Sequence, residues 1–388
     1  MIEFVLVAAL ALLAYTYAGY PALVWMLACC SRRRSRGAAY EPHVTVIVVV
    51  YNEGARIGRK LDTCIGCDYP AEKLRVLVAS DGSDDDTHEI VATYAARAVA
   101  LLAFPARRGK AACLNDAIAA SDGEVVVLTD ARQRLDASAI RHLVESLADP
   151  AVGAASGELV FEADGMTPFG EGVDAYWRYE KFIRRQESRV HSVVGVTGAL
   201  YALRRECFRD IPVDTILDDV VIPMNVVMAG KRVVFEGRAL AFDVPSRDHQ
   251  QEKLRKVRTI AGNFQLMAAH PAFFVPFRNP IFVQLVSHKV LRLVSPYCLV
   301  LLLLANALLA SGGLFYQCLL AAQLLAYALP VIGVLRPSSR RWKVVKVATA
   351  FVMLNWFAVL GALEFARNRN AHLWNSRQRA AAGNSRFR

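Results

Sequence analysis

Between about residues 44 and 245, short apolar runs alternate with segments of helical periodicity. The apolar runs predict buried strands, and the segments between them predict helices. Because such alternation is typical of parallel βαβ units with right-handed crossovers, we expect an α/β fold. The expected strands are residues 44–50, 74–79, 99–103 and 125–128, and the expected helices are residues 55–66, 86–97, 109–120 and 137–147.

Longer apolar runs flank this domain on both sides. Residues 2–28 are long enough to cross a bilayer, and the start Met1-Ile2-Glu3 lacks the positive charge of a cleaved signal peptide. Further runs follow at about residues 293–310, 313–335 and 345–365. The pattern therefore predicts one N-terminal and about three C-terminal transmembrane helices.

Composition agrees with a membrane protein. Of the 388 residues, 55% are hydrophobic, and the mean hydropathy of +0.29 is high for a soluble enzyme. The net charge of +11 could indicate a nucleic-acid partner. However, the arginines cluster beside the apolar runs, as the positive-inside rule describes, so we expect no nucleic acid.

The same rule predicts which loops are cytoplasmic. The basic residues 32–36 and the basic loop 336–346 should lie inside, which leaves the N-terminus outside. With three C-terminal crossings, however, the arginine-rich tail falls outside, against the rule. One of the C-terminal runs is then a candidate for a re-entrant or interfacial segment.

These patterns divide the chain into five parts. Residues 1–30 are the expected N-terminal transmembrane helix, and residues 42–248 are the α/β domain. Residues 249–285 mix Lys253, Arg255, Lys256 and Arg258 with apolar side chains, which is typical of amphipathic helices at a membrane interface or on a soluble surface. Residues 293–365 hold the C-terminal transmembrane helices, and residues 366–388 are a basic tail.

The eight cysteines show no regular framework. Cys64 and Cys67 have the CxxC spacing of redox and zinc sites, but no second pair or histidine cluster accompanies them. Their position in a predicted helix favours ordinary packing.

Polar residues follow several expected strands where these end. Asp130 follows 125–128, Asp81 and Gly82 follow 74–79, and Tyr51 follows 44–50. If the strands are parallel, these ends share the sheet edge at which open α/β folds bind ligands. A carboxylate such as Asp81 can accept the imide hydrogen of uracil, Gly82 can let the backbone approach a ligand, and Lys110 at a helix start can meet a phosphate. Taken alone, Asp130 could instead cap a helix.

In order and spacing, these motifs resemble family 2 glycosyltransferases, especially membrane-bound members such as cellulose, hyaluronan and poly-N-acetylglucosamine synthases. That family has a GT-A fold and a nucleotide-sugar donor. The resemblance implies donor binding by Tyr51, Asn52, Glu53, Asp81, Lys110, Asp130, Arg132 and Arg258, and acceptor binding by Trp177, Gly198 and Ala199. In Leu217-Asp218-Asp219, it implies that Asp219 is the catalytic base and Asp218 its acidic partner.

The chemistry of sugar transfer explains these residue types. The leaving diphosphate needs positive charge, commonly a Mg²⁺ or Mn²⁺ ion, for which Asp130 is the candidate ligand. The acceptor hydroxyl needs a base, and a base opposite the leaving group gives inversion. The alternative for Asp218 and Asp219 is that one of them caps the helix that follows.

Two positions depart from the family pattern. The usual Asp-x-Asp metal motif here reads Asp130-Ala131-Arg132, so either one carboxylate and the diphosphate hold the metal, or Arg132 supplies the charge. Where processive members carry Gln-x-x-Arg-Trp, this chain has Arg258-Thr259. The missing Trp weakens the case for a held polymer, although Arg258 can still bind the diphosphate.

We therefore expect an inverting glycosyltransferase of the bacterial inner membrane with its catalytic domain in the cytoplasm. Its donor would be a UDP-linked sugar, and its acceptor a growing exopolysaccharide or a lipid-linked glycan, with export or assembly subunits as further partners. Two alternatives stay open: transfer of one sugar to a lipid, and an inactive subunit that only binds nucleotide.

Overall fold

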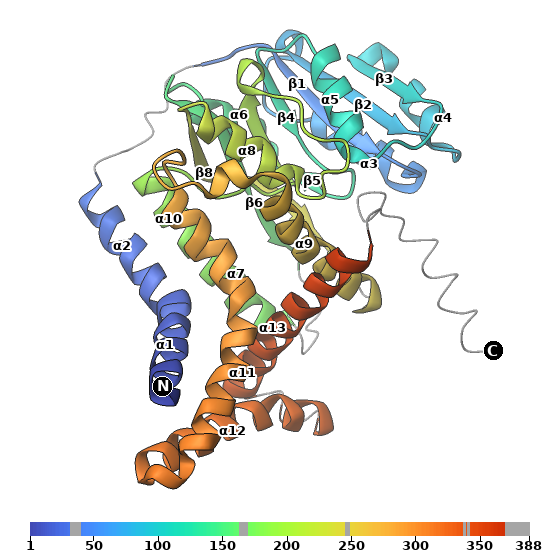
Figure 1. Cartoon of the computed structure of the whole chain (residues 1–388). Helices are drawn as coiled ribbons and strands as arrows, with labels where there is room; N and C mark the ends of the chain where they lie inside the picture. Colours follow the sequence, from blue (N-terminus) through green and yellow to red (C-terminus); the bar gives the residue numbers. More distant parts are fainter. Residues whose placement is uncertain (32–39, 163–169, 245–248, 337–338, 340–341, 369–388) are drawn as a thin grey trace, which may run out of the picture.

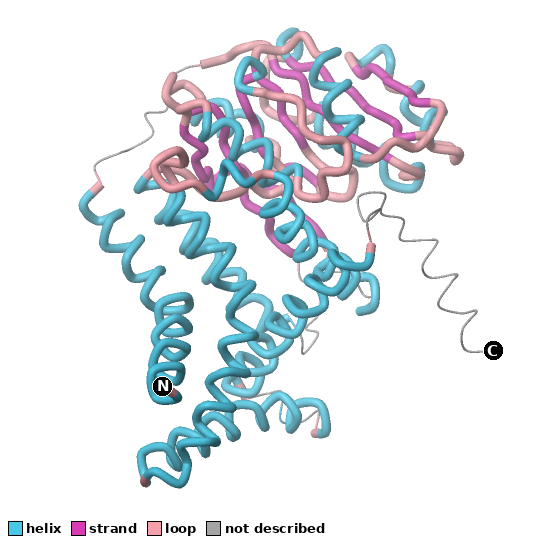
Figure 2. Tube along the Cα trace, viewed as in Figure 1, coloured by secondary structure: helices cyan, strands magenta, loops and turns pink. Residues whose placement is uncertain are grey.

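The computed structural model describes residues 1–31, 40–162, 170–244, 249–336, 339 and 342–368. Within them, eight strands form one mixed sheet (Figure 2). The strands are β1 (Val44–Val50), β2 (Leu74–Asp81), β3 (Val99–Phe104), β4 (Val125–Leu128), β5 (Arg134–Leu135), β6 (Val152–Phe161), β7 (Tyr201–Arg204) and β8 (Arg232–Asp243). Their order is β3-β2-β1-β4-β7-β6-β8-β5.

Helices cover the sheet and extend below it (Figure 1). Those of the α/β half are α3 (Gly54–Ile65), α4 (Thr87–Ala92), α5 (Lys110–Ala120), α6 (Ala139–Ser146), α7 (Gly170–Val190), α8 (Asp218–Met228) and α9 (His249–Ala269), with short 3-10 turns η2 (Ala71–Lys73), η3 (Ala95–Arg97), η4 (Arg205–Cys207) and η5 (Pro271–Phe274). Those of the apolar half are α1 (Ile2–Ala14), η1 (Tyr15–Gly19), α2 (Tyr20–Cys30), α10 (Phe282–Leu285), η6 (Val286–Val290), α11 (Leu291–Leu309), η7 (Ala310–Gly312), α12 (Leu314–Leu335) and α13 (Lys343–Arg367).

The four expected strands form the parallel part of the sheet. β1 pairs in parallel with both β2 and β4, and β2 pairs in parallel with β3. β7 is antiparallel to β4 and joins this part to β6, β8 and β5. The predicted α/β fold with a mostly parallel core is confirmed.

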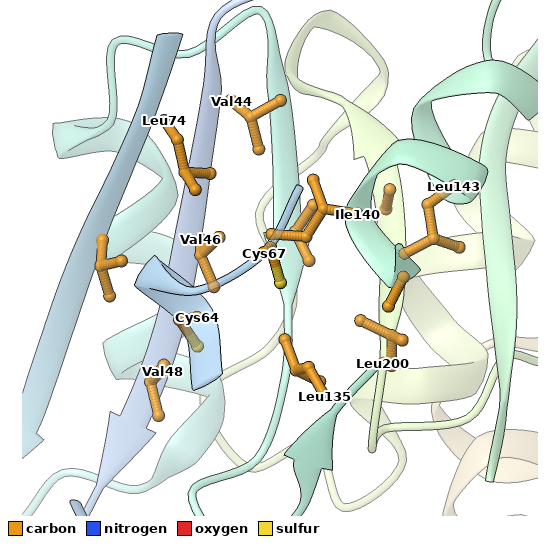
Figure 3. Close-up of a cluster of buried hydrophobic side chains, with 14 of the residues drawn as sticks. Val44, Val46, Val48, Cys64, Cys67, Leu74, Leu135, Ile140, Leu143 and Leu200 are labelled. Carbon is orange, nitrogen blue, oxygen red and sulfur yellow. The ribbon is translucent and has the colours of Figure 1, made fainter. Parts of the chain in front are cut away.

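The central strands β1 and β4 are buried on both faces, which is why they read as continuous apolar runs. On one face, Val46 and Val48 of β1 pack with α3, α4 and α6 (Figure 3). On the other face, Ile47 packs with α5 and α8, and this second core continues into α9 and α10. Cys64 of α3 and Cys67, two residues beyond its end, lie in the first core among apolar side chains, as free thiols.

Four helical segments are long and apolar enough to cross a membrane, one N-terminal and three C-terminal, as predicted. They are Ile2–Cys30, Phe282–Gly312, Leu314–Gly333 and Lys343–Arg367. The N-terminal segment packs antiparallel to α11 through a small apolar core that includes Leu6, Leu13, Cys298 and Leu302.

The second segment begins earlier than its hydrophobicity indicates. A continuous helix runs from Phe282 through η6 into α11, whereas the expected span began at residue 293. The charged residues His288 and Arg292 interrupt the apolar pattern there. In the structure both pair with acidic residues of α7, so the helix can continue through them.

The last apolar helix, α13, ends beside α9. α13 rises back to the catalytic domain and packs along α9 (Figure 1). Phe365, near its C-terminal end, stacks on Phe264, with ring centroids 6.3 Å apart. Lys343 lies at the opposite end of α13, and the cytoplasmic position of the basic loop before it stays a prediction. The basic residues 32–36 and the tail beyond residue 368 lie outside the described residues.

Candidate active site

The turn after β4 carries Asp130, and a buried lysine holds this turn in place through hydrogen bonds. Lys60 of α3 is only 2% exposed, and its ammonium donates to Thr129 Oγ1 at 2.6 Å and to the Gln133 carbonyl at 2.9 Å. Thr129 in turn donates to the Ala199 carbonyl at 2.6 Å. Burial lowers the pKa of Lys60. The turn is therefore held at both ends, and it presents Asp130 in a fixed position.

Arg132 has a structural partner at this turn. Its guanidinium pairs with Asp243 at the end of β8, and the Gln133 amide donates to the same carboxylate at 3.0 Å. Asp243 is 3% exposed, so its charge needs this pairing. The contact commits part of the Arg132 guanidinium to the fold.

Lys110 connects two of the expected acidic residues. It is the first residue of α5, behind Gly109 with its positive φ of 96°. Its ammonium lies 3.0 Å from Asp130 Oδ1 and 3.1 Å from Asp218 Oδ2. Burial alone would lower the pKa of Lys110, but these two carboxylates raise it, so the lysine stays charged.

Asp218 and Asp219 form the first turn of α8, where the helix dipole favours negative charge. The residue that precedes this turn is Leu217, and no side chain caps it. Burial, followed by the charge of Asp218, raises the pKa of Asp219 from its ordinary 3.8 to about 6. A carboxylate with such a pKa is a stronger base than an exposed aspartate and is still ionised at neutral pH.

Asp130 and Asp219 face the same space. A side-chain carbon placed on Gly198 would lie 3.8 Å from Asp130 Oδ2 and 3.9 Å from Asp219 Oδ2. Arg258 of α9 lies close enough for Asp218, Asp219 and Asp130 all to act on its pKa, which burial lowers. Gly198 therefore lies between the two carboxylates, and the space beside it that both face is called the opening below; Lys110 and Arg258 lie close by.

Tyr201 lies beneath this opening and has no counterpart among the predicted site residues. It is 1% exposed, and its hydroxyl has no hydrogen-bond partner among the described residues. Burial, and then the charges of Asp218, Asp219 and Asp130, raise its pKa, so the hydroxyl stays protonated as a donor. A buried, unpaired donor at a site edge is suited to a substrate oxygen.

The loops after β1 and β2 have more internal contacts than the sequence indicates. Asp81 accepts the backbone N–H of Arg108 at 2.5 Å and that of Gly109 at 3.0 Å, so it positions the start of α5. Gly82 has a φ of 70° and lies against the backbone of residues 106 and 107, not at an open face. The Arg107 guanidinium lies over the ring of Tyr51, with its Cζ 4.2 Å from the ring centroid. The two stacked groups form a flat surface suited to a nucleobase.

Asn52 and Glu53 fasten the same loops together. Asn52 has a positive φ of 53°, donates to Asp84 Oδ1 at 2.5 Å and accepts the Asp84 N–H at 3.0 Å. The Glu53 N–H donates to Thr87 Oγ1, and its carboxylate pairs with Arg56. Both residues thus shape the donor-side loops through protein contacts.

The expected acceptor residues separate into two groups. Gly198 and Ala199 belong to the opening, as described. Trp177 of α7 packs on Phe161, with ring centroids 5.6 Å apart, and within the described ranges no hydrogen bond or ring contact joins it to the aspartates. Its place in acceptor binding remains a prediction.

A metal would have few protein ligands. Among the described residues, no group of three His, Cys, Asp or Glu side chains could hold an ion. Mg²⁺ and Mn²⁺ are, however, often held by one or two carboxylates together with substrate phosphates. The half-exposed Asp130, with Oδ2 facing the opening, fits that arrangement.

Comparison with known proteins identifies the domain. Residues 45–211 match the family described as Glycosyl transferase family 2. Residues 45–211 are thus a Glycosyl transferase family 2 domain. The predicted resemblance is confirmed, and with it the GT-A fold and the enzyme class of the domain.

The glycosyltransferase relatives are similar over part of the chain. An N-acetylglucosaminyltransferase from Rhizobium sp. (strain N33) is 32% identical over 174 residues, which are 44% of this chain and 38% of the relative. A beta-monoglucosyldiacylglycerol synthase from Synechocystis sp. is 28% identical over 152 residues, which are 37% of this chain and 32% of the relative. The chain therefore spans about a third of the length of these curated relatives.

One solved glycosyltransferase is similar over nearly the whole chain. It is the mannosyltransferase PcManGT from Pyrobaculum calidifontis, in complex with GDP-Man and Mn²⁺. The TM-score is 0.70 at 27% identity, with 95% of this chain and 99% of that chain covered. The similarity thus includes the apolar helices as well as the domain.

Proposed function

We propose that this chain is an inverting glycosyltransferase that moves a sugar from a nucleotide-sugar, UDP-linked, to a hydroxyl of a glycan or lipid-linked acceptor at the membrane. The observation that carries the proposal is the position of Asp219. It has a raised pKa of about 6 and faces the same opening as Asp130, which lies at the ligand-binding edge of the sheet.

Asp219 would act as the base. Its carboxylate takes the proton of the acceptor hydroxyl, and the oxygen forms a bond to the anomeric carbon as the bond to the nucleoside diphosphate breaks. Attack from the side opposite the diphosphate inverts the configuration. Asp218 assists by keeping the pKa of Asp219 high, while its own charge is balanced by Lys110.

Lys110 and Arg258 would stabilise the leaving diphosphate. Both lie beside Asp130, and Lys110 is held charged by its two carboxylate partners. A Mg²⁺ or Mn²⁺ ion on Asp130 and the donor phosphates would add positive charge there. PcManGT was solved with GDP-Man and Mn²⁺, which supports a nucleotide-sugar and a divalent cation here.

We propose the cytoplasmic face of a bacterial inner membrane as the location, with export or assembly subunits as further partners. Nucleotide-sugars are cytoplasmic, and four apolar helices lie directly below the catalytic domain (Figure 1). The opening at Gly198 is lined by α8 and approached by α9, which packs on α13. An acceptor held in the membrane would therefore be close to the base.

Transfer of one sugar to a lipid is the second candidate. Arg258-Thr259 lacks the Trp of polymer-holding members, and one relative is named for a monoglucosyl lipid product. The length of the product separates the two candidates, because a synthase extends its product and a single-sugar transferase stops after one addition.

The test is incubation of membranes that contain the chain with radiolabelled UDP- and GDP-sugars, with and without chelator. We expect one donor to label a lipid or glycan, with Asp219→Asn as the inactive control. No donor consumption by the purified chain would overturn the proposal and favour a nucleotide-binding subunit. Full activity in chelator would remove the metal from it.

A further inference from the structure

Two further positive charges act on Asp219 from the side of the apolar helices. They belong to Arg184 of α7 and Lys289 of η6. Both lower the pKa of Asp219, which burial raises. Neither is among the residues expected from the sequence. Lys289 lies within an apolar segment long enough to cross a membrane, where a charged residue is costly and marks a functional site by default.

The spacing along α7 fixes where Arg184 lies. Residues 180, 184 and 187 are four and three positions apart, so they share one face of the helix. Glu180 and Glu187, on either side of Arg184, both contact His288 of η6, at 3.0 and 2.8 Å. Arg184 therefore lies on the face of α7 that meets η6 and Lys289.

The acidic residues of this junction already have partners. Glu180 pairs with Arg292 and His288, and Glu187 accepts from the Tyr20 hydroxyl at 2.5 Å and contacts His288. In contrast, Arg184 and Lys289 form no hydrogen bond or ion pair within the described part of the chain. Both are half-buried, so their charges lose hydration without gaining a partner.

The donor does not account for these two charges. Lys110 and Arg258 lie beside Asp130, where the nucleotide-sugar diphosphate would leave. Arg184 and Lys289 approach Asp219 from α7 and η6, which pack against the membrane helices. The surplus positive charge is therefore on the acceptor side of the base.

We infer that Arg184 and Lys289 bind a phosphate of the acceptor. The acceptor is then an anionic lipid whose attacking hydroxyl lies a few bonds from a phosphodiester or diphosphate group. Arginine and lysine are the usual partners of such groups. This inference rests on the proposed function and adds the chemical class of the acceptor to it.

The test compares acceptors of different charge with the full chain in zwitterionic nanodiscs and the donor found above. The acceptors are neutral diacylglycerol, phosphatidylglycerol and a polyprenyl diphosphate sugar, and the last two separate the sources of phosphate. We expect Arg184→Gln and Lys289→Gln each to raise the KM for the anionic acceptor about tenfold or more, with the donor KM unchanged. Arg185→Gln is the matched control, because Arg185 pairs with Glu158 and is largely exposed.

Binding without turnover keeps the two proposals separate. We expect the wild-type chain to bind lysophosphatidylglycerol more tightly than lysophosphatidylcholine, and both variants to lose that preference. Equal binding of the two lipids by the wild type would overturn the inference even if transfer to a neutral acceptor depends on Asp219. A raised donor KM in the variants would also overturn it, because the charges would then belong to the donor. Preferential binding without any transfer would count against the proposed function alone.

Discussion

Replacing Asp219 by asparagine should have opposite effects on activity and on stability. Asparagine has nearly the same shape, but it cannot take a proton and carries no charge. Loss of the base should lower the transfer rate on the order of 100-fold or more. Because burial disfavours the charged carboxylate, the variant should at the same time unfold less readily at neutral pH.

The raised pKa gives the size of the stability change. A rise from 3.8 to about 6 corresponds to at most about 3 kcal/mol of unfavourable free energy in the ionised folded protein. With a folded pKa above the unfolded one, the contribution of Asp219 to stability is fully present below pH 3.8 and is lost as the pH rises through 6. The advantage of the asparagine variant should therefore be greatest above pH 6 and vanish near pH 4.

The assay is thermal unfolding of the purified chain and its Asp219→Asn variant between pH 4 and 8, together with transfer rates. The wild-type kcat/KM should fall as the pH drops through about 6, because Asp219 becomes protonated. Binding of the donor nucleotide should be unchanged in the variant. A variant that unfolds more readily at pH 7.5 and still transfers sugar would refute the reasoning, since that is the behaviour of a lost helix cap, which costs about 1 kcal/mol.

Three further variants probe the surroundings of the base. Lys110→Met should raise the donor KM and move the acid limb of the kcat/KM profile up by roughly 0.5–1 pH unit, since Lys110 lowers the pKa of Asp219; an unmoved limb in a pH titration would contradict this. Tyr201→Phe should leave thermal stability unchanged or raise it by about 1 kcal/mol while transfer falls about tenfold, because the hydroxyl has no partner among the described residues; unchanged kinetics would argue against a substrate contact. Gly361→Ala should lower the free energy of unfolding by about 1–3 kcal/mol and also lower activity, because its methyl group would overlap Ile260. Gly312→Ala, whose added carbon would lie 3.6 Å from its nearest neighbour, is the control in the same unfolding assay.

The parallel half of the fold could be predicted because burial on both faces leaves a direct trace in the sequence. β1 and β4 coincide with the predicted strands, and the turns that follow β1, β2 and β4 were expected at one edge for that reason. β7 could not be placed the same way. The four residues of β7, Tyr201–Arg204, do not indicate whether the strand is parallel or antiparallel to its neighbour. Its antiparallel pairing with β4 depends on contacts between residues that are distant in sequence.

Several site residues that were not predicted are charged side chains whose burial does not follow from the neighbouring sequence. Lys60 reads as an ordinary helical lysine, and only the tertiary fold shows that it is buried beneath Thr129. Arg292 reads as an isolated charge before an apolar run, because its partner Glu180 lies on α7, 112 residues away in sequence. Lys289 reads the same way, because Asp219 is distant in sequence. The sequence indicates such residues only as single charges in an otherwise apolar run, and charges of this kind are candidates for functional residues.

The return of α13 to the catalytic domain means that the active site is not a property of the catalytic domain alone. Gly361 lets α13 approach the backbone of α9 beside Ile260, two positions from Arg258. In the proposed arrangement, a membrane helix thus sets the place of Arg258, and Lys289 acts on Asp219 from another. A bilayer that is too thin or too thick would tilt these helices and displace the charges at the sugar. On the proposed function, the bilayer is in this sense a structural component, and cutting the chain at the membrane surface would remove part of the proposed site.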